Sequence, residues 1–231
     1  MNRLDADLMA MLGMSDDSKS VWVMEFDGPS AKQFYTQFMK LERDDEVRII
    51  PVFISSYGGE IYALTAMRDL IKSSHKPVAT IAVGMAMSCG ASLLAAGSKG
   101  YRFASPDTQI LIHQASGFAP GKASELEEFA KVMKDLNNTM FKNLAKDTGR
   151  DIEEFEKEIH RRKNVDWTLK ASAAKRWGLI DHIGIPRPQN HPPMMFIGNN
   201  ESYDSKIAME TAAKAAKRPK KSSKKKGARR A

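Results

Sequence analysis

The stretch GMAMSCGAS, residues 84–92, places the hydroxyl of Ser88 among small and apolar side chains, just ahead of an apolar run. A serine hydroxyl is a weak nucleophile at neutral pH and reacts when a neighbouring base takes its proton. At a helix start, backbone N–H groups without helical partners surround it and can stabilise an oxyanion, and the N–H of Cys89 is one of them. The pattern indicates a candidate nucleophile, although a serine in such a turn more often caps a helix.

A second oxyanion donor has a candidate in the YGG turn, residues 57–59. Glycine lets a backbone N–H approach a ligand closely, which suits such a turn to the task. Cys89 is an alternative nucleophile, but a lone cysteine among apolar residues is usually inert. The GxxxSxG spacing around Ser88 also differs from the GxSxG elbow of the α/β-hydrolases. The turn alone therefore does not identify an enzyme class.

A base for the serine must come from one of five histidines: His75, His113, His160, His182 and His191. His113 is the best placed, because it ends the apolar run QILIH and precedes a glycine-bearing loop. A lone histidine at a strand end can equally be structural. For a carboxylate that orients the imidazole, spacing alone does not choose among many acids. Asp166, beside Trp167 and just before a predicted helix, is one candidate.

Predicted strands and helices alternate around these residues. Apolar and β-branched segments predict strands over 21–26, 47–54, 78–83, 101–104, 109–113 and 179–183. Helical spacing and capping residues predict helices over 30–41 with Ser30 as cap, 60–73, 88–96, 123–147, a segment from Asp151 with Glu154 three residues on, and 171–178. This order predicts an α/β domain with a largely parallel sheet covered by helices. In such sheets functional groups gather where strands end and helices begin, as both turns do.

Length and composition fit one large soluble domain with appendages. The chain has 231 residues, of which 42% are hydrophobic and 28% charged. It contains no apolar run long enough to span a membrane, and its start lacks the order of a secretory signal. A single cysteine excludes an internal disulfide and, without a Cys/His cluster, a zinc-finger-like site. We expect a cytoplasmic protein with no membrane contact.

The net charge of +8 is concentrated at the C-terminus. Residues 214–231 contain ten Lys or Arg and no acid, so residues 1–213 carry about −2. The composition of this basic tail predicts disorder, and the tail is either a solubilising end or a contact for nucleic acid or an acidic partner. Residues 186–213 are interpreted as a linker with a short helix, and residues 1–19 as a separate N-terminal segment.

Three segments carry a family resemblance: ISSYGGEIYALTAMRDLI (54–71), GMAMSCGASLLAAGSKGYRFASPDTQILIHQ (84–114) and ASAAKRWGLIDHI (171–183). In this order and at these separations they resemble the proteolytic subunit of the Clp protease. The similarity extends over about residues 20–185. It implies the Clp/crotonase fold, an α/β spiral of βαβ units from which helix 123–147 protrudes as a handle that pairs subunits.

The resemblance also implies roles for individual residues. Ser88 falls on the family's nucleophile, His113 on its general base and Asp166 on the third member of its triad. The backbone N–H groups of Gly59 and Cys89 fall on its oxyanion donors. An extended substrate is expected to pair with residues 115–118 by strand addition, with contacts at Gly58, Ser116 and Gly117.

The preferred hypothesis is a serine endopeptidase that hydrolyses peptide bonds of unfolded or structural proteins inside an oligomeric ring. The family implies homo-oligomeric, sevenfold rings, single or stacked, and neither a metal nor any other cofactor. It also implies an ATP-driven unfoldase as partner. Only about 20 residues precede the first predicted strand, fewer than the family's axial-loop segment, which argues against that docking.

Two departures from the family pattern leave alternatives open. Tyr57 stands where the family usually has proline, and about four extra residues precede Asp166, which is assigned by counting back from GLID. One alternative is a Clp-like structural or regulatory subunit without turnover. A second is a crotonase-type acyl-CoA hydratase or isomerase, which shares the fold but uses carboxylates as acid and base. A third places the function in the basic tail, as nucleic-acid binding.

Overall fold

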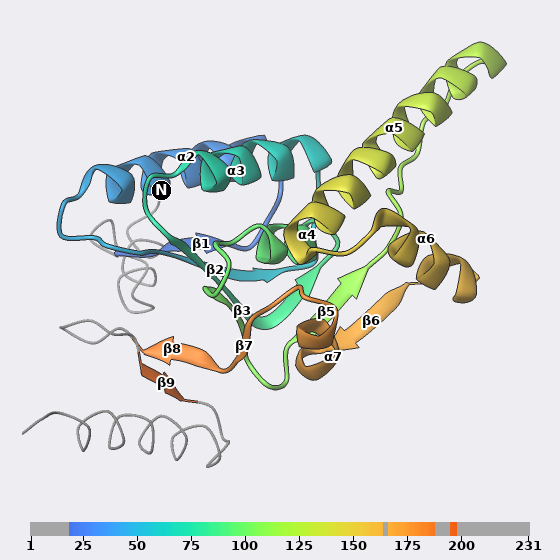
Figure 1. Cartoon of the computed structure of the whole chain (residues 1–231). Coiled ribbons are helices and arrows are strands. Elements are labelled where there is room, and N and C mark those ends of the chain that lie inside the picture. Colours follow the sequence, from blue (N-terminus) through green and yellow to red (C-terminus); the bar gives the residue numbers. More distant parts are fainter. Residues whose placement is uncertain (1–18, 164–165, 188–194, 198–231) are drawn as a thin grey trace, which may run out of the picture. The chain divides into compact units, whose positions relative to one another are not determined.

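The computed structural model describes residues 19–163, 166–187 and 195–197 (Figure 1). The chain divides into two compact units, Met1–Phe196 and Ile197–Ala231, and the fold described below belongs to the first. The predicted basic tail lies outside the described residues, as do most of the predicted linker and all of the N-terminal segment except Lys19.

A central sheet of seven strands organises the first unit. Its strands are β1 (Val21–Val23), β2 (Ile50–Ser56), β3 (Val78–Met87), β4 (Arg102–Ala104), β5 (Gln109–Ile112), β6 (Trp167–Lys170) and β7 (His182–Ile183). Strands β1, β2, β3, β4 and β7 lie side by side in that order and are all parallel. Strand β5 pairs in parallel with β3, and β6 pairs antiparallel with β5. The prediction of a largely parallel sheet is confirmed.

The length of β3 allows the sheet to divide into two branches. The middle of β3, Thr80–Ala82, pairs with β4, whereas its end, Met85–Met87, pairs with β5. The first five residues of β3 are all buried, as expected for a central strand covered on both faces. The second branch therefore begins at the carboxyl end of β3, next to Ser88.

Within the described residues, six helices connect and cover the strands. They are α2 (Gly28–Arg43), α3 (Ile61–Ser73), α4 (Cys89–Ala95), α5 (Ala123–Thr148), α6 (Ile152–Arg161) and α7 (Ala171–Arg176). Figure 1 shows α2 and α3 on the same face of the sheet and α5 projecting away from it. Helix α2 buries Phe34, Phe38 and Leu41, which fall on one stripe at helical spacing. The predicted α/β spiral of βαβ units with a protruding helix is confirmed.

Helix α4 is buried at each of its seven positions. It packs against β3 and between α3 and α5. Its sequence, CGASLLA, explains this complete burial, because small residues allow several elements to pack closely around one short helix. The apolar run that follows Ser88 is therefore part of the core.

Helix α5 is buried only near its C-terminal end, at Met140, Phe141, Leu144 and Ala145. No residue of 123–139 is buried, and Leu126 is 44% exposed. The N-terminal part of the apolar stripe on this helix is thus only partly covered by the described part of its own chain.

Three local predictions need correction. Helix α2 begins at Gly28, and Asp27 rather than Ser30 is its cap, because the Asp27 carboxylate accepts from the Ser30 N–H at 2.7 Å. A strand, β6, and not a helix follows Asp166, because residues 167–170 pair with β5. The strand expected over 179–183 is reduced to His182–Ile183.

Other boundaries agree more closely with the sequence. Helix α5 ends one residue beyond the predicted 123–147. The Glu154 carboxylate accepts from the N–H of Asp151 at 3.4 Å, as expected at the start of α6.

Beyond β7, strand β8 (Ile185–Arg187) pairs with β9 (Met195–Ile197).

A buried ion pair joins β4 to the segment before β7. Arg102, 2% exposed, donates from Nη2 to Asp181 at 2.6 Å and from Nε to the other carboxylate oxygen at 2.9 Å. Its Nη1 also donates to the Asp147 carbonyl near the end of α5, at 2.9 Å. Burial alone would raise the pKa of Asp181, but hydrogen bonds and charge from Arg102 and the N–H of Gly100 outweigh it, so the pKa lies below its ordinary value.

Replacing Asp181 with Asn tests this pair. Arg102 would keep its buried charge without a counter-charge, and we expect a loss of about 2–3 kcal/mol in the free energy of unfolding at pH 7. Because the folded-state pKa is lowered, the carboxylate's contribution to stability is fully present above the ordinary value of 3.8. It is lost as the pH falls from there through the lower folded-state pKa. Urea unfolding at pH 7 and at acid pH, at fixed protein concentration, should show the difference from wild type shrinking on acidification.

The control for this experiment is Asp107→Asn, which changes an exposed carboxylate on the turn between β4 and β5. It should leave the unfolding free energy within about 0.5 kcal/mol of wild type. A loss at Asp181→Asn that stays constant from pH 7 into the acid range would contradict the ion-pair account.

Candidate active site

Ser88 lies between β3 and α4 in a strained backbone conformation. Its φ of 55° and ψ of −117° are unusual, and Lys163 is the only other non-glycine residue with positive φ among those described. Such a conformation costs about 1–3 kcal/mol and persists only where the surroundings hold it. The Ser88 N–H donates to the Leu111 carbonyl at 2.8 Å, and its own carbonyl accepts from the Ala91 N–H at 3.1 Å. Both β5 and α4 therefore hold the strained turn.

His113 follows the last residue of β5 and meets the serine. The register of β5 on β3 pairs Met87 with Leu111, so both strands end at the same edge of the sheet. The Nε2 atom of His113 lies 2.7 Å from the Oγ atom of Ser88, a hydrogen-bond distance. Both side chains are half-buried. The structure thus brings together two residues that are 25 positions apart in sequence.

Asp166 precedes β6 where His113 follows β5, and the two side chains are not hydrogen-bonded to each other. Strands β5 and β6 pair Ile112 with Trp167, and a continuation of this register by one residue would place Asp166 opposite His113. Directly opposite residues on antiparallel strands have Cβ atoms about 4.5–5.5 Å apart. Asp166 is exposed, and no hydrogen bond links it to His113 within the described residues.

The YGG turn packs directly against the serine. Gly58 has a φ of 108°, and a Cβ atom there would come within 2.7 Å of the Cβ of Ser88. At Gly59, with a φ of 149°, a Cβ would come within 2.4 Å of the Phe26 carbonyl oxygen. The Gly58 N–H donates to the hydroxyl of buried Ser56 at 3.0 Å. Both positions therefore require glycine, for space as well as for backbone conformation.

Two backbone N–H groups near Ser88 could bind an anion. No oxygen among the described residues accepts from the N–H of Gly59 or of Cys89. Burial raises the pKa of the Cys89 thiol, and backbone hydrogen bonds of both residues nevertheless act on the thiol and offset part of that rise. The N–H of Cys89 belongs to the first turn of α4, where backbone donors have no helical partner. The two groups are linked through the Cys89 thiol, which donates to the Gly59 carbonyl at 3.2 Å.

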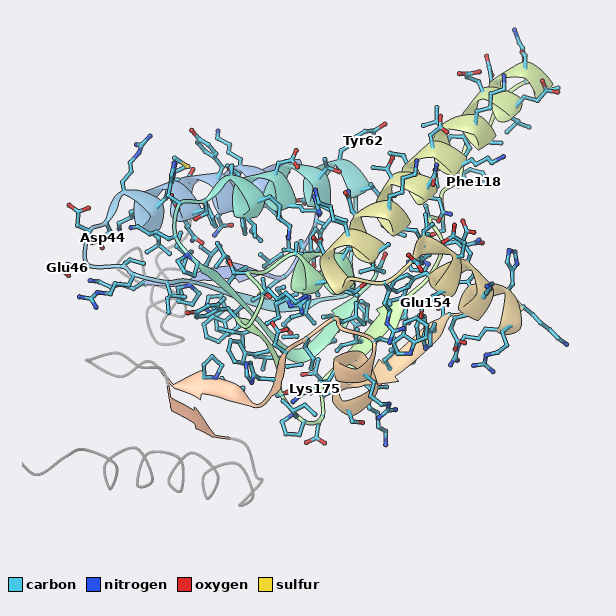
Figure 2. All side chains as sticks on the ribbon, viewed as in Figure 1. Asp44, Glu46, Tyr62, Phe118, Glu154 and Lys175 are labelled. Atoms are coloured by element: carbon cyan, nitrogen blue, oxygen red, sulfur yellow. The ribbon has the colours of Figure 1, made fainter. Side chains whose placement is uncertain are left out.

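The segment after His113 runs along the handle helix. The N–H of Ala115 donates to the Asn137 side chain on α5 at 3.0 Å, and a Cβ on Gly117 would come within 2.9 Å of the Phe129 ring. Ser116 and Gly117, the predicted peptide contacts, are exposed. Phe118, which is 89% exposed, also lies beside α5 (Figure 2). Residues 116–118 of this segment, which follows His113, are therefore exposed.

Two supporting residues escaped the sequence analysis. Ser56 holds the glycine turn, and Asn137 holds the segment after His113. Ser56 lies at an inward-facing position of β2, in which buried and partly buried residues alternate. A polar residue at such a position indicates a hydrogen-bonding role. Asn137 lies in the interior of α5, where asparagine is uncommon. Its position there is a weaker indication of a supporting role than that of Ser56.

The other described histidines lie elsewhere. His75 contacts Glu42, His182 stacks on Phe103 and His160 belongs to α6, so none of the three takes part in the site. His191 lies outside the described residues. In the part of the chain that the structure describes, no group of three or more His, Cys, Asp or Glu side chains could hold a metal ion. The helices described also include none long and apolar enough to cross a membrane.

The Clp protease family model matches residues 9–187 of this chain. The match covers most of the sequence and includes both turns, His113 and Asp166. The chain belongs to the Clp protease family. A peptidase of the Clp type is therefore the class of activity that its family indicates.

Tyr57, which replaces the proline usual in Clp proteases, does not abolish the glycine turn. Its side chain is 74% exposed, and the two glycines that follow keep their positive φ angles. The tyrosine thus changes the surface beside the turn, and the backbone of the two glycines still faces Ser88.

Replacing Gly58 with Ala tests whether the turn must lie against the serine. The new methyl group has no room beside Ser88, so either the turn or the hydroxyl must move. We expect labelling of Ser88 by a fluorophosphonate to slow about 100-fold or more, since small displacements at a reacting centre are costly. Gly28→Ala is the matched control, because nothing lies within 4 Å of its Cβ position, and it should label at the wild-type rate. Equal rates for the two variants would contradict the packing account.

Proposed function

We propose that this Clp-type peptidase is a serine endopeptidase with Ser88 as nucleophile and His113 as general base. The observation that carries the proposal is the 2.7 Å contact between Ser88 Oγ and His113 Nε2 at a strained turn. A hydroxyl hydrogen-bonded to an imidazole nitrogen can transfer its proton as it attacks. The same contact and the family match favour the peptidase over an acyl-CoA hydratase or isomerase.

In the proposed acylation step, His113 Nε2 takes the Ser88 proton while Oγ bonds to the carbonyl carbon of the substrate peptide. The carbonyl oxygen becomes an oxyanion and accepts hydrogen bonds from the N–H groups of Gly59 and Cys89. His113 then gives its proton to the departing amine, and an acyl ester on Ser88 remains. Water, activated by His113 in the same way, hydrolyses the ester.

Asp166 is proposed as the third member of this triad. A place opposite His113, in continuation of the β5–β6 register, would let its carboxylate reach the other imidazole nitrogen by a side-chain rotation. A carboxylate there would fix the imidazole tautomer and stabilise the imidazolium formed during catalysis. Catalytic hydrogen bonds are often absent or long before substrate binds and form in the complex.

Substrate binding and assembly are proposed from the two surfaces beside the serine. An extended peptide would pair with residues 115–118 by strand addition, along the exposed residues 116–118. The partly exposed apolar stripe at 123–139 is proposed to be buried against further copies of the chain, in the rings that the family resemblance implies. A ring that encloses the site would admit unfolded chains or short peptides.

One observation favours a second candidate, a subunit without turnover. Asp166 is exposed and makes no described hydrogen bond to His113, so the imidazole lacks an orienting partner in the single chain. The two candidates differ in the reactivity of Ser88, because a subunit without turnover has no need of an activated hydroxyl.

Replacing Ser88 with Ala tests the proposed chemistry. Loss of the nucleophile should lower kcat for a fluorogenic peptide and for unfolded casein by about 10⁴-fold or more. The wild-type protein should form a fluorophosphonate adduct on Ser88, located by mass spectrometry, and the variant should not. Wild-type protein that forms oligomers but neither cleaves nor labels would instead support the subunit without turnover. Equal cleavage by both proteins would refute the assignment of Ser88.

Replacing Asp166 with Asn tests the third position. An amide keeps the shape of the side chain but no longer favours the imidazolium, so we expect kcat to fall by about 10²–10⁴ with little change in KM. The control is Asp107→Asn, an exposed carboxylate that precedes β5. If Asp166→Asn and the control are equally active on a fluorogenic peptide, another group orients His113.

A further inference from the structure

We propose that the side chain of Cys89 is a positioning group for the oxyanion site: its thiol, bonded to the Gly59 carbonyl, sets the direction of the Gly59 N–H. The inference rests on the serine-peptidase function proposed above. Any residue at position 89 would supply the backbone N–H, so the inference gives a role to the side chain of the single cysteine in the chain.

The need for such a group comes from the two glycines. Glycine can rotate about φ and ψ at little steric cost, so a Gly–Gly turn does not by itself hold an N–H in one direction. An oxyanion donor must nevertheless point at the developing charge before the reaction, because reorienting it during the reaction would cost the stabilisation that it supplies. The peptide groups on either side of the Gly58–Gly59 bond must therefore be held.

Hydrogen bonds hold both neighbouring peptide groups. On one side, the Gly58 N–H donates to the Ser56 hydroxyl at 3.0 Å. On the other, the Glu60 N–H donates to the Phe26 carbonyl at 2.7 Å, and the Gly59 carbonyl accepts from the Cys89 thiol at 3.2 Å. The Gly59–Glu60 peptide is thus bonded at both its N–H and its C=O. With both flanking peptides held, fewer backbone rotations remain that could turn the Gly59 N–H away from Ser88.

The chemical state of the thiol suits this role. Cys89 is 1% exposed, and burial raises the pKa of its thiol, so the S–H form that can donate persists at neutral pH. A thiolate would have no proton to give to the Gly59 carbonyl. The nearby imidazole is bonded to Ser88 and not to this sulfur, so Cys89 has no base to make it a nucleophile.

Cys89 also connects the two halves of the oxyanion site. Its own N–H is one proposed donor, and its side chain holds the turn that bears the other. Because every residue of α4 is buried, the position of the Cys89 side chain is fixed, and the sulfur can hold the glycine turn in one place. A change at this side chain should therefore affect stabilisation of the transition state more than binding of the substrate.

The test compares Cys89→Ala with Cys89→Ser, two side chains of nearly equal volume of which only serine can donate. Removing a whole oxyanion donor lowers kcat by about 10²–10³, so misdirecting one should lower it by about 10-fold in Cys89→Ala. We expect KM for a fluorogenic peptide to change less than about twofold, and Cys89→Ser to recover most of kcat. Affinity for a peptide boronate, whose adduct on Ser88 places an oxygen at the donors, should fall in parallel with kcat.

Ser92→Ala is the matched control, because it removes one polar atom from the same buried helix without touching the glycine turn. It should leave kcat within about twofold of wild type, a factor equivalent to under 0.5 kcal/mol. Melting temperatures of the three variants then separate a general loss of stability from an effect on the reaction.

Amide hydrogen exchange over residues 55–61 provides a readout that does not depend on activity. Exchange should be faster in Cys89→Ala than in wild type and close to wild type in Cys89→Ser. Wild-type protein that neither cleaves nor binds the boronate would refute the peptidase, and the exchange pattern would still decide whether the thiol holds the turn. If the alanine and serine variants match each other in kcat and in exchange, the thiol has no positioning role.

Discussion

The pairing of β5 with the carboxyl end of β3 is the interaction on which the site depends. It places His113 at the same sheet edge as Ser88, and its last hydrogen bond, from the Ser88 N–H to the Leu111 carbonyl, holds the strained turn. Strand β5 in turn pairs with β6, which directly follows Asp166. A ten-residue β3 is needed for this, because its middle is already paired with β4. Strand β3 thus forms part of the core through its first half and positions the active-site residues through its second half.

The strain at Ser88 is balanced by the burial that surrounds it. Helix α4 begins at the next residue and leaves no position exposed to solvent, so the turn cannot relax without disturbing a packed helix. On the opposite side, Gly58 fills the space beside the serine so closely that even a methyl group would collide. The reactive hydroxyl is therefore held by backbone bonds and by the shape of its neighbours, as preorganised sites require.

Most local features and the largely parallel sheet could be predicted from the sequence, whereas elements that depend on a particular long-range pairing could not. The turn before α4, the handle helix and the start of α6 depend on residues within a few positions of one another, and they were predicted. Strand β6 was missed because four residues become a strand only when β5 is beside them. The cap at Asp27 was missed because Ser30 offered an equally good local signal. Residue periodicity alone could not pair Ser88 with His113, and the family resemblance supplied that expectation.

The burial of the one cysteine has a practical consequence for spectroscopy. The chain has a single sulfhydryl, shielded from solvent and with a raised pKa, so maleimide dyes and nitroxides will not attach to the native protein. A cysteine introduced at an exposed site on the outer half of α5, such as Lys131, would then be the sole point of attachment. Distances between such probes could report how copies of the chain approach one another, with the native residue left in place.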